Sequence, residues 1–138
     1  MALTLFTIFI SPLSFAATLN SISQKQFQTA FVNKTAATIG EEKLNGNPIN
    51  NPFAIYMDDH GKIWARMAYK PTSAPQEDEG TYTIGKDGTL YLQWNHWFKS
   101  KKLCARFYDA KNAYIVLGCD GTFQTIFMKD AIMAGKQF

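Results

Sequence analysis

The sequence predicts a mostly β protein, an antiparallel up-and-down meander of about seven to eight strands with one short N-terminal helix. Three observations support this fold class. From Phe53 onwards, apolar residues alternate with polar ones over short runs, which is the period of a half-buried strand. Tight turns of the Asp-Gly type separate the runs. The stretch with helical spacing lies before all of them.

The predicted helix spans residues 21–31, with Ser21 or Ser23 available as its N-cap. Its apolar residues recur at helical spacing, at Ile22, Phe27, Ala30 and Phe31. After the helix, residues 35–39 are a candidate first strand. Residues 41–52 are rich in Asn, Gly and Pro, and this composition predicts a long loop.

Three β-hairpins and a last strand are predicted after this loop, because tight turns separate each pair of alternating runs. Residues 71–80, which contain prolines and the acidic run Glu77-Asp78-Glu79, are predicted to be a loop. The strands can close into a small barrel or fold as a curved sheet against the helix, and the sequence leaves both open. A barrel of about eight strands has an interior just large enough for side chains or for one small ligand. The predicted strands are 53–57, 63–69, 81–84, 90–94, 103–109, 113–118 and 122–128.

The start of the chain resembles a cleavable signal peptide, so we expect a signal peptide at residues 1–16 and a single β-rich domain at 17–138. Residues 3–13 are almost continuously hydrophobic but shorter than the about 20 residues of a membrane-spanning helix. Ser14 and Ala16 are the small residues that signal peptidase accepts before a cut at Ala17, although the usual positive charge before Leu3 is missing. The alternative is a buried N-terminal strand. No later segment is apolar enough for a transmembrane anchor, and the predicted location is periplasmic or secreted.

Cys104 and Cys119 are the two cysteines, and export into an oxidising space predicts a disulfide between them. The register of the third hairpin supports the same pairing. A two-residue turn at Lys111-Asn112 places Cys104 opposite Cys119, and a four-residue loop does the same, whereas a three-residue loop shifts the register by one. No CxxC or HxxxH spacing is present, so neither a metal site nor a redox-active pair is predicted.

The composition is that of one globular domain. The chain has 138 residues, of which 46% are hydrophobic and 14% aromatic, and it is long enough to bury a core of its own. The formal net charge of +3 is far from the dense basic surface of a dedicated nucleic-acid binder. We therefore predict no nucleic-acid partner.

The candidate binding residues lie between Trp94 and Lys102, where aromatic rings are mixed with lysines at the predicted end of a hairpin. Aromatic faces beside cations bind glycans, anionic lipid head groups or other polyanions. This cluster predicts a non-catalytic exported module that binds a glycan, an anionic lipid head group, or an envelope or host protein. In the alternative reading, the rings cover a barrel rim and the lysines protect a sheet edge. The predicted binding residues are His96, Trp97, Phe98, Lys99, Lys101 and Lys102.

The rival hypothesis is an extracytoplasmic hydrolase or enzyme inhibitor that uses His96 or the acidic run at 77–79. A charge run in a Pro-containing loop is usually just solvated, and neither His60 nor His96 has a partner that is visible in the sequence. No GxSxG nucleophile motif is present. The aspartates at 58, 59, 87 and 120 lie in Asp-Gly or Asp-x-Gly turns, where they bond backbone amides rather than calcium. No catalytic residue, metal or cofactor is therefore predicted.

Several of these motifs occur in a fixed order along the chain. They are Tyr56-Met57-Asp58-Asp59-His60-Gly61, Asp78-Glu79-Gly80-Thr81-Tyr82, Asp87-Gly88, Leu92-Gln93-Trp94-Asn95, Cys104-Ala105-Arg106 and Asp120-Gly121-Thr122. Over residues 53–135 the chain resembles the bacterial domain-of-unknown-function family 995, a family of exported proteins without a known activity. Members of that family carry Cys at the position of Tyr91, paired with the Cys of the next strand. The resemblance therefore implies that Cys104 has exchanged its partner for Cys119 and that the bridge stabilises the fold.

Overall fold

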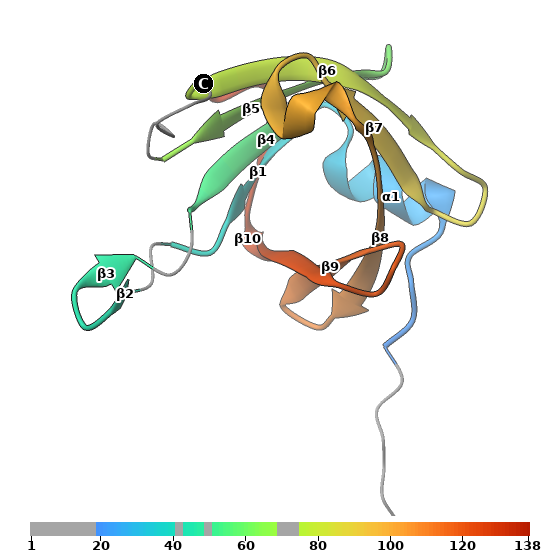
Figure 1. Ribbon diagram of the computed structural model, residues 1–138. Coiled ribbons are helices and arrows are strands. Elements are labelled where there is room, and N and C mark those ends of the chain that lie inside the picture. The colour runs from blue at the N-terminus through green and yellow to red at the C-terminus, as the bar shows by residue number, and fades with distance from the viewer. Residues whose placement is uncertain (1–18, 41–42, 49–50, 69–74) are drawn as a thin grey trace, which may run out of the picture.

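The structure of the protein is a computed structural model, which describes residues 19–40, 43–48, 51–68 and 75–138. The signal peptide predicted at residues 1–16 lies outside these ranges. Antiparallel strands close into a barrel in the order β1-β10-β9-β8-β7-β6-β5-β4, with β4 pairing back to β1. Figure 1 looks roughly along the barrel, with the helix α1 behind the ring of strands. The prediction of a mostly β meander is confirmed, and of its two forms the chain adopts the barrel.

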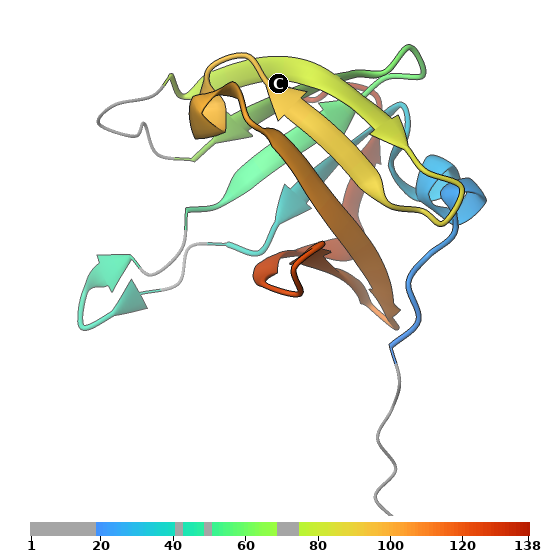
Figure 2. The same cartoon turned by 45° about the vertical axis from the view of Figure 1, so that its right-hand side comes forward.

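From β4 to β10, strands that are consecutive in sequence are neighbours in the barrel. A small separate hairpin is inserted between β1 and β4. The helix α1 spans Gln24–Phe31, and the barrel strands are β1 (Lys34–Thr38), β4 (Phe53–Met57), β5 (Lys62–Met67), β6 (Glu77–Ile84), β7 (Leu90–Trp94), β8 (Lys102–Ala110), β9 (Ala113–Gly118) and β10 (Phe123–Ala134). The inserted strands are β2 (Lys43–Leu44) and β3 (Asn47–Pro48), and a 3₁₀ turn, η1 (Trp97–Ser100), follows β7. Figure 2 shows that the β2–β3 hairpin extends away from the barrel.

Helix α1 begins at a capping box built on Ser23. The Ser23 hydroxyl accepts a hydrogen bond from the backbone N–H of Gln26 at 3.3 Å, and the Gln26 side chain accepts one from the Ser23 N–H at 2.8 Å. Of the two predicted caps, Ser23 is thus the one that is used. Phe27 and Phe31 are fully buried, and each packs against Phe107 of β8 with ring centroids 4.9 Å apart. The helix thereby closes one end of the barrel.

The segment before the helix is fixed to the same end. The Ile22 N–H donates to the Phe107 carbonyl at 2.9 Å. Gly88, in the β6–β7 turn, lies so close to Ile22 that a Cβ at position 88 would overlap the Ile22 carbonyl oxygen. Its φ of +80° also favours glycine. The β6–β7 turn and the helix therefore form one packed end of the molecule.

Connections alternate between the two ends because the barrel is up-and-down. The β4–β5, β6–β7 and β8–β9 turns lie at the helix end, where Gln24 Nε2 donates to the Ile84 carbonyl at 2.9 Å and the Asp109 N–H donates to the Asn20 carbonyl at 3.3 Å. The β7–β8 and β9–β10 connections therefore lie at the opposite end, together with the last residues of β1 and β5 and the first residues of β4 and β6, as Figure 2 shows.

The hairpin of β8 and β9 has the register that the cysteines predict. Ala105 pairs with Gly118, and the turn lies at 111–112. Cys104 and Cys119 form a disulfide with Cα atoms 5.5 Å apart, within the usual range for such bonds. The predicted pairing is confirmed.

Two predicted loops are partly strand. β6 begins at Glu77, so the acidic run lies in a strand rather than in a solvated loop. Since successive side chains of a strand point to opposite faces, Glu77 and Glu79 are exposed, whereas Asp78 is only 6% exposed. The region predicted as a loop at 41–52 contains the β2–β3 hairpin. The last strand, predicted at 122–128, extends to Ala134, because β10 pairs first with β9 and then with β1.

Candidate functional site

A cavity of about 620 Å³ lies inside the barrel. Side chains from β4, β5 and β7 to β10 line it, and most are the inward-facing residues of these strands. Small-molecule sites in proteins have volumes of about 300 to 1,000 Å³, so this cavity has the size of a ligand site. The apolar residues that line it are Phe53, Ile55, Ile63, Met67, Leu90, Leu92, Trp94, Trp97, Phe98, Leu103, Ala105, Phe107, Val116 and Phe127.

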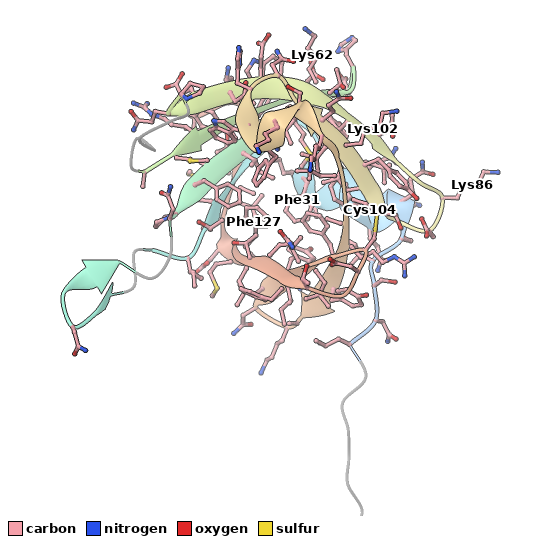
Figure 3. The ribbon with its side chains drawn as sticks, in the orientation of Figure 1. Phe31, Lys62, Lys86, Lys102, Cys104 and Phe127 are labelled. Atoms are coloured by element: carbon pink, nitrogen blue, oxygen red, sulfur yellow. A yellow bond between two sulfur atoms is a disulfide. The ribbon has the colours of Figure 1, made fainter. Side chains whose placement is uncertain are left out.

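The floor of the cavity is aromatic and tightly packed. Phe107 and Phe127 stack with an interplanar angle of 4° and ring centroids 6.1 Å apart. Phe31 of the helix supports both from behind, with its centroid 4.9 Å from that of Phe107 and 5.8 Å from that of Phe127. Figure 3 labels Phe31 and Phe127, which come together from the helix and from β10. The helix end of the cavity is therefore closed by ring-on-ring packing.

Most of the polar lining residues gather at the opposite end. They come from the segment before β4, the start of β8, and the β9–β10 connection with the beginning of β10. We call this end of the cavity, formed by these segments and η1, the mouth. The polar residues lining the cavity are Asn51, Lys102, Asp120, Thr122, Gln124 and Thr125.

A buried carboxylate fixes the β7–β8 connection at the mouth. Asp78 Oδ2 accepts hydrogen bonds from the backbone N–H groups of His96 and Trp97 at 2.9 and 2.8 Å. Its Oδ1 accepts from the Glu79 N–H at 2.9 Å and lies 3.0 Å from His96 Nδ1. Burial on its own raises the pKa of Asp78, but these hydrogen bonds outweigh burial and hold the pKa below its ordinary value. Asp78 is therefore an ionised anchor for the connection.

Trp97 is held from two sides. Its indole N–H donates to the Pro75 carbonyl at 2.8 Å, and its ring packs on Trp94 with centroids 5.1 Å apart. The side chain is consequently buried, although it borders the cavity.

The next three residues have an unusual backbone. Phe98, Lys99 and Ser100 have φ values of 54°, 56° and 54°, a left-handed conformation that non-glycine residues rarely adopt. Ser100 is held in it by its hydroxyl, which donates to the Asn95 carbonyl at 2.6 Å, and by its own carbonyl, which accepts from Gln93 Nε2 at 2.9 Å. This backbone places Phe98 at the edge of the cavity with 57% of its surface exposed.

The structure brings the six predicted binding residues together in and around η1. Trp97, Phe98 and Lys102 line the cavity at the mouth, Lys99 and Lys101 are exposed beside them, and His96 is paired with Asp78. The sequence did not reveal the inward-facing residues of the cavity wall as a site. Alternation indicates which side chains face the interior, but it does not indicate whether they fill it.

The alternative hypothesis of an enzyme is supported by one contact, between Asp78 and His96, but the nucleophile that it needs is not in contact with this pair. Asp78 and His96 form a pair, with the imidazole 69% exposed and the carboxylate 1% exposed. Among the described residues, however, no hydroxyl or thiol hydrogen-bonds to this imidazole. Nor do three potential metal ligands gather anywhere in the described ranges. The pair therefore has the geometry of a loop anchor, and a nucleophile for His96 to activate is not in contact with it.

Of the predicted turn aspartates, Asp58, Asp87 and Asp120 make the local hydrogen bonds that the turn motifs predict, whereas Asp59 Oδ1 lies 2.7 Å from His60 Nδ1. Asp58 Oδ1 accepts from the His60 N–H at 3.0 Å, Asp87 Oδ1 from the Thr89 N–H at 3.1 Å, and Asp120 Oδ1 from the Thr122 N–H at 3.0 Å. At the mouth, Asp120 also accepts from the Thr122 hydroxyl at 2.7 Å. The hydrogen bonds from Thr122 hold the pKa of Asp120 below its ordinary value.

Comparison with known proteins returned no family model, no curated protein and no solved structure that matches this chain. Within the described residues, no helix has the length and apolar character needed to span a membrane.

Proposed function

We propose that this protein binds one small apolar or amphipathic molecule inside its barrel, as a non-catalytic module of the cell envelope or the extracellular space. The observation that carries the proposal is the cavity of about 620 Å³, with apolar walls and with polar residues gathered at its mouth. This arrangement suits a guest whose apolar part lies against the floor and whose polar group remains near the mouth.

The energetics of such a cavity favour an apolar guest. Removing apolar surface from water gains roughly 25 cal/mol per Å², so a guest that buries roughly 400 Å² gains about 10 kcal/mol. Association costs about 4 kcal/mol or more in lost freedom of motion. The difference corresponds to an affinity of roughly tens of micromolar. A hydrophilic guest gains little of this, because few polar side chains line the walls to replace its bonds to water.

The disulfide supports export. The Cys104–Cys119 bridge suits an oxidising compartment and agrees with the signal peptide predicted at 1–16, which favours a periplasmic or secreted location. Tyr91 lies directly opposite Cys104 in the β7–β8 pairing. The resemblance to the bacterial domain-of-unknown-function family 995 places paired cysteines at these two positions, and this register is compatible with such a bridge.

A second candidate function, an extracytoplasmic hydrolase, rests on the Asp78–His96 pair. Both carboxylate oxygens of Asp78 also accept backbone N–H groups. The pair therefore already has a structural role in holding the mouth. We consider the binding function better supported, because the cavity has no such competing explanation.

The test compares two neighbouring residues of β7 that face opposite ways. Leu92 faces the cavity and Tyr91 is exposed on the outer wall. In delipidated protein, Leu92→Trp should weaken binding of anilinonaphthalene sulfonate, and of palmitic acid that displaces it, by at least about tenfold, because the larger ring occupies the cavity. Tyr91→Trp should bind both probes like the wild-type protein.

Circular dichroism and thermal unfolding should show that both variants fold. Leu103→Trp, at another wall position, is the replacement if Leu92→Trp does not fold. Undiminished binding by a folded cavity variant would show that the cavity is not the site. Failure of the wild-type protein to bind either probe would overturn the proposed ligand class.

A further inference from the structure

We propose that the mouth of the barrel docks onto an anionic lipid surface. The claim goes beyond ligand binding in the cavity, and only its corollary, that a guest passes between the bilayer and the barrel, rests on the proposed function. The proposal depends on what the mouth presents outward, which includes an exposed aromatic ring and three lysines beside the opening of the cavity.

The first observation is the exposure of Phe98. Phe98 has 57% of its surface exposed, and it begins a run of three non-glycine residues in a left-handed backbone that such residues rarely adopt. The connection that carries it is tied to the barrel through Asp78 and the Trp97 indole. Phe98 is therefore presented on a fixed support rather than on a loose loop.

A second ring lies on the other side of the opening. Phe123, the first residue of β10, is 61% exposed, and its neighbours Thr122 and Gln124 line the same cavity. Figure 1 shows η1 and the β9–β10 connection on opposite sides of the ring of strands. One exposed ring, Phe98, therefore lines the cavity at its mouth, and a second, Phe123, belongs to a segment that borders the mouth.

Cations accompany the rings. Lys99, Lys101 and Lys102 are all exposed and belong to η1 or to the residues that follow it. Exposed acidic groups also lie at this end. Glu77, at the start of β6, pairs with Arg66 at 3.3 Å, Glu79 is exposed, and the Asp120 carboxylate accepts hydrogen bonds from Thr122 that do not neutralise its charge. The basic surface is therefore the η1 segment with its three lysines.

Aromatic rings beside lysines suit both the charged head-group surface of an anionic bilayer and the apolar boundary beneath it. Aromatic side chains partition into the boundary between head groups and acyl chains, and lysines are attracted to the negative surface, by about fivefold in binding for each lysine. The exposed Phe98 ring can enter the apolar boundary of the bilayer while the lysines beside it contact anionic head groups. The apolar ring and the adjacent positive charge together favour a lipid surface.

The decisive experiment measures co-sedimentation of the full chain with two kinds of vesicle. One contains phosphatidylcholine alone, and the other contains phosphatidylcholine and phosphatidylglycerol in equal parts. We expect the wild-type protein to bind the anionic vesicles selectively. The variant Lys99→Gln/Lys101→Gln/Lys102→Gln should bind them about a hundredfold more weakly, as the loss of three lysines implies.

The matched control removes the same charge from the helix end. Lys25→Gln/Lys62→Gln/Lys86→Gln has the same net charge as the mouth variant, and all three of its lysines are exposed. Figure 3 labels Lys62 and Lys86. The control should keep wild-type binding, and equal losses in the two variants would overturn the proposal, because they would reflect net charge alone.

The ring contribution has its own pair of variants. Phe98→Ala should weaken binding to anionic vesicles several-fold, whereas Tyr91→Ala, which removes a ring that is 50% exposed on the outer wall, should not. Selective binding of the wild-type protein to a glycan array or to a protein, without vesicle binding, would overturn the proposal.

The experiments test docking of the mouth and ligand binding in the cavity independently of each other. The lysine variant of the mouth should still bind palmitic acid in vesicle-free buffer, and Leu92→Trp should still bind vesicles. Loss of probe binding in Leu92→Trp together with its unchanged vesicle binding supports both proposals, whereas vesicle binding by a protein that takes up no probe would leave docking standing without the ligand.

Discussion

The Asp78 carboxylate accepts a hydrogen bond at 2.8 Å from the backbone N–H of Trp97, which lies 19 residues later in the chain. Asp78 is the charged residue among the buried polar side chains of the described ranges. Its burial is compensated by hydrogen bonds to one short connection. One carboxylate therefore holds the β7–β8 connection in its place at the mouth.

Replacing this carboxylate should loosen the mouth. In Asp78→Asn, the amide NH₂ replaces an acceptor and faces backbone donors, so we expect a loss of about 2 to 3 kcal/mol in the free energy of unfolding. Hydrogen exchange at the Trp97 amide should accelerate. Glu79→Gln, the exposed neighbour, should change stability by less than about 0.5 kcal/mol. Equal effects of the two variants in denaturant titrations would contradict the anchor role.

Alkaline pH should destabilise the fold through Tyr82. Burial, and then the charges of Asp58 and Asp59, raise its pKa to about 12 from the ordinary value of 10.0. Its hydroxyl donates to the Asp58 carbonyl. The stabilisation is complete below pH 10, where the unfolded chain also holds the proton, and is lost as the pH rises through the folded pKa near 12.

This loss should be on the order of 2 kcal/mol. It is measured as the difference between the wild-type protein and Tyr82→Phe in denaturant midpoints between neutral and alkaline pH. Tyr91→Phe, at an exposed position, should lose as much stability between neutral and alkaline pH as the wild-type protein does. If Tyr82→Phe also loses as much as the wild-type protein, the alkaline loss comes from other groups.

The disulfide should stabilise the hairpin that borders the mouth. Cys104 and Cys119 are separated by 15 residues, and loop entropy gives such a bridge about 3 kcal/mol. Cys104→Ser/Cys119→Ser should lose about that amount in chemical unfolding. Intact mass with and without reductant measures the bridge directly. Two free thiols in protein recovered from an oxidising compartment would refute it.

The register of β7 against β8 predicts an alternative bridge. Tyr91 lies opposite Cys104, so Tyr91→Cys combined with Cys119→Ser should form a 91–104 disulfide without reorganising the barrel. Thr83→Cys with Cys119→Ser is the matched control, because Thr83 pairs with Tyr91 and is therefore one strand further from Cys104. A control that bridges equally well would show that the strands pair differently from this register.

Local patterns predicted much of the fold. Alternation located the strands, and the turn at Lys111-Asn112 located the disulfide, because both depend on residues that are near in sequence. The start of β6 was missed because a charged run normally indicates solvent, whereas one of its three acids faces inward and finds its donors 18 and 19 residues away. A partner at that separation leaves no local signal.

The sequence predicted one part of the candidate site and missed the other. The aromatic and basic cluster was visible because its residues are consecutive. The cavity beneath it was not, since its volume depends on how side chains from many strands meet across the barrel. The floor depends on Phe31 of the helix reaching Phe107 and Phe127, rings that only the tertiary fold brings together.

That floor makes the barrel a cup rather than a tube. A guest held against Phe107 and Phe127 arrives and departs through one end, so the mouth governs both directions of exchange. A substitution there that does not touch the bound guest should change the rates of association and dissociation by the same factor and leave Kd unchanged. Equilibrium titrations would miss such a change, whereas stopped-flow measurements would resolve the residence time of the bound molecule.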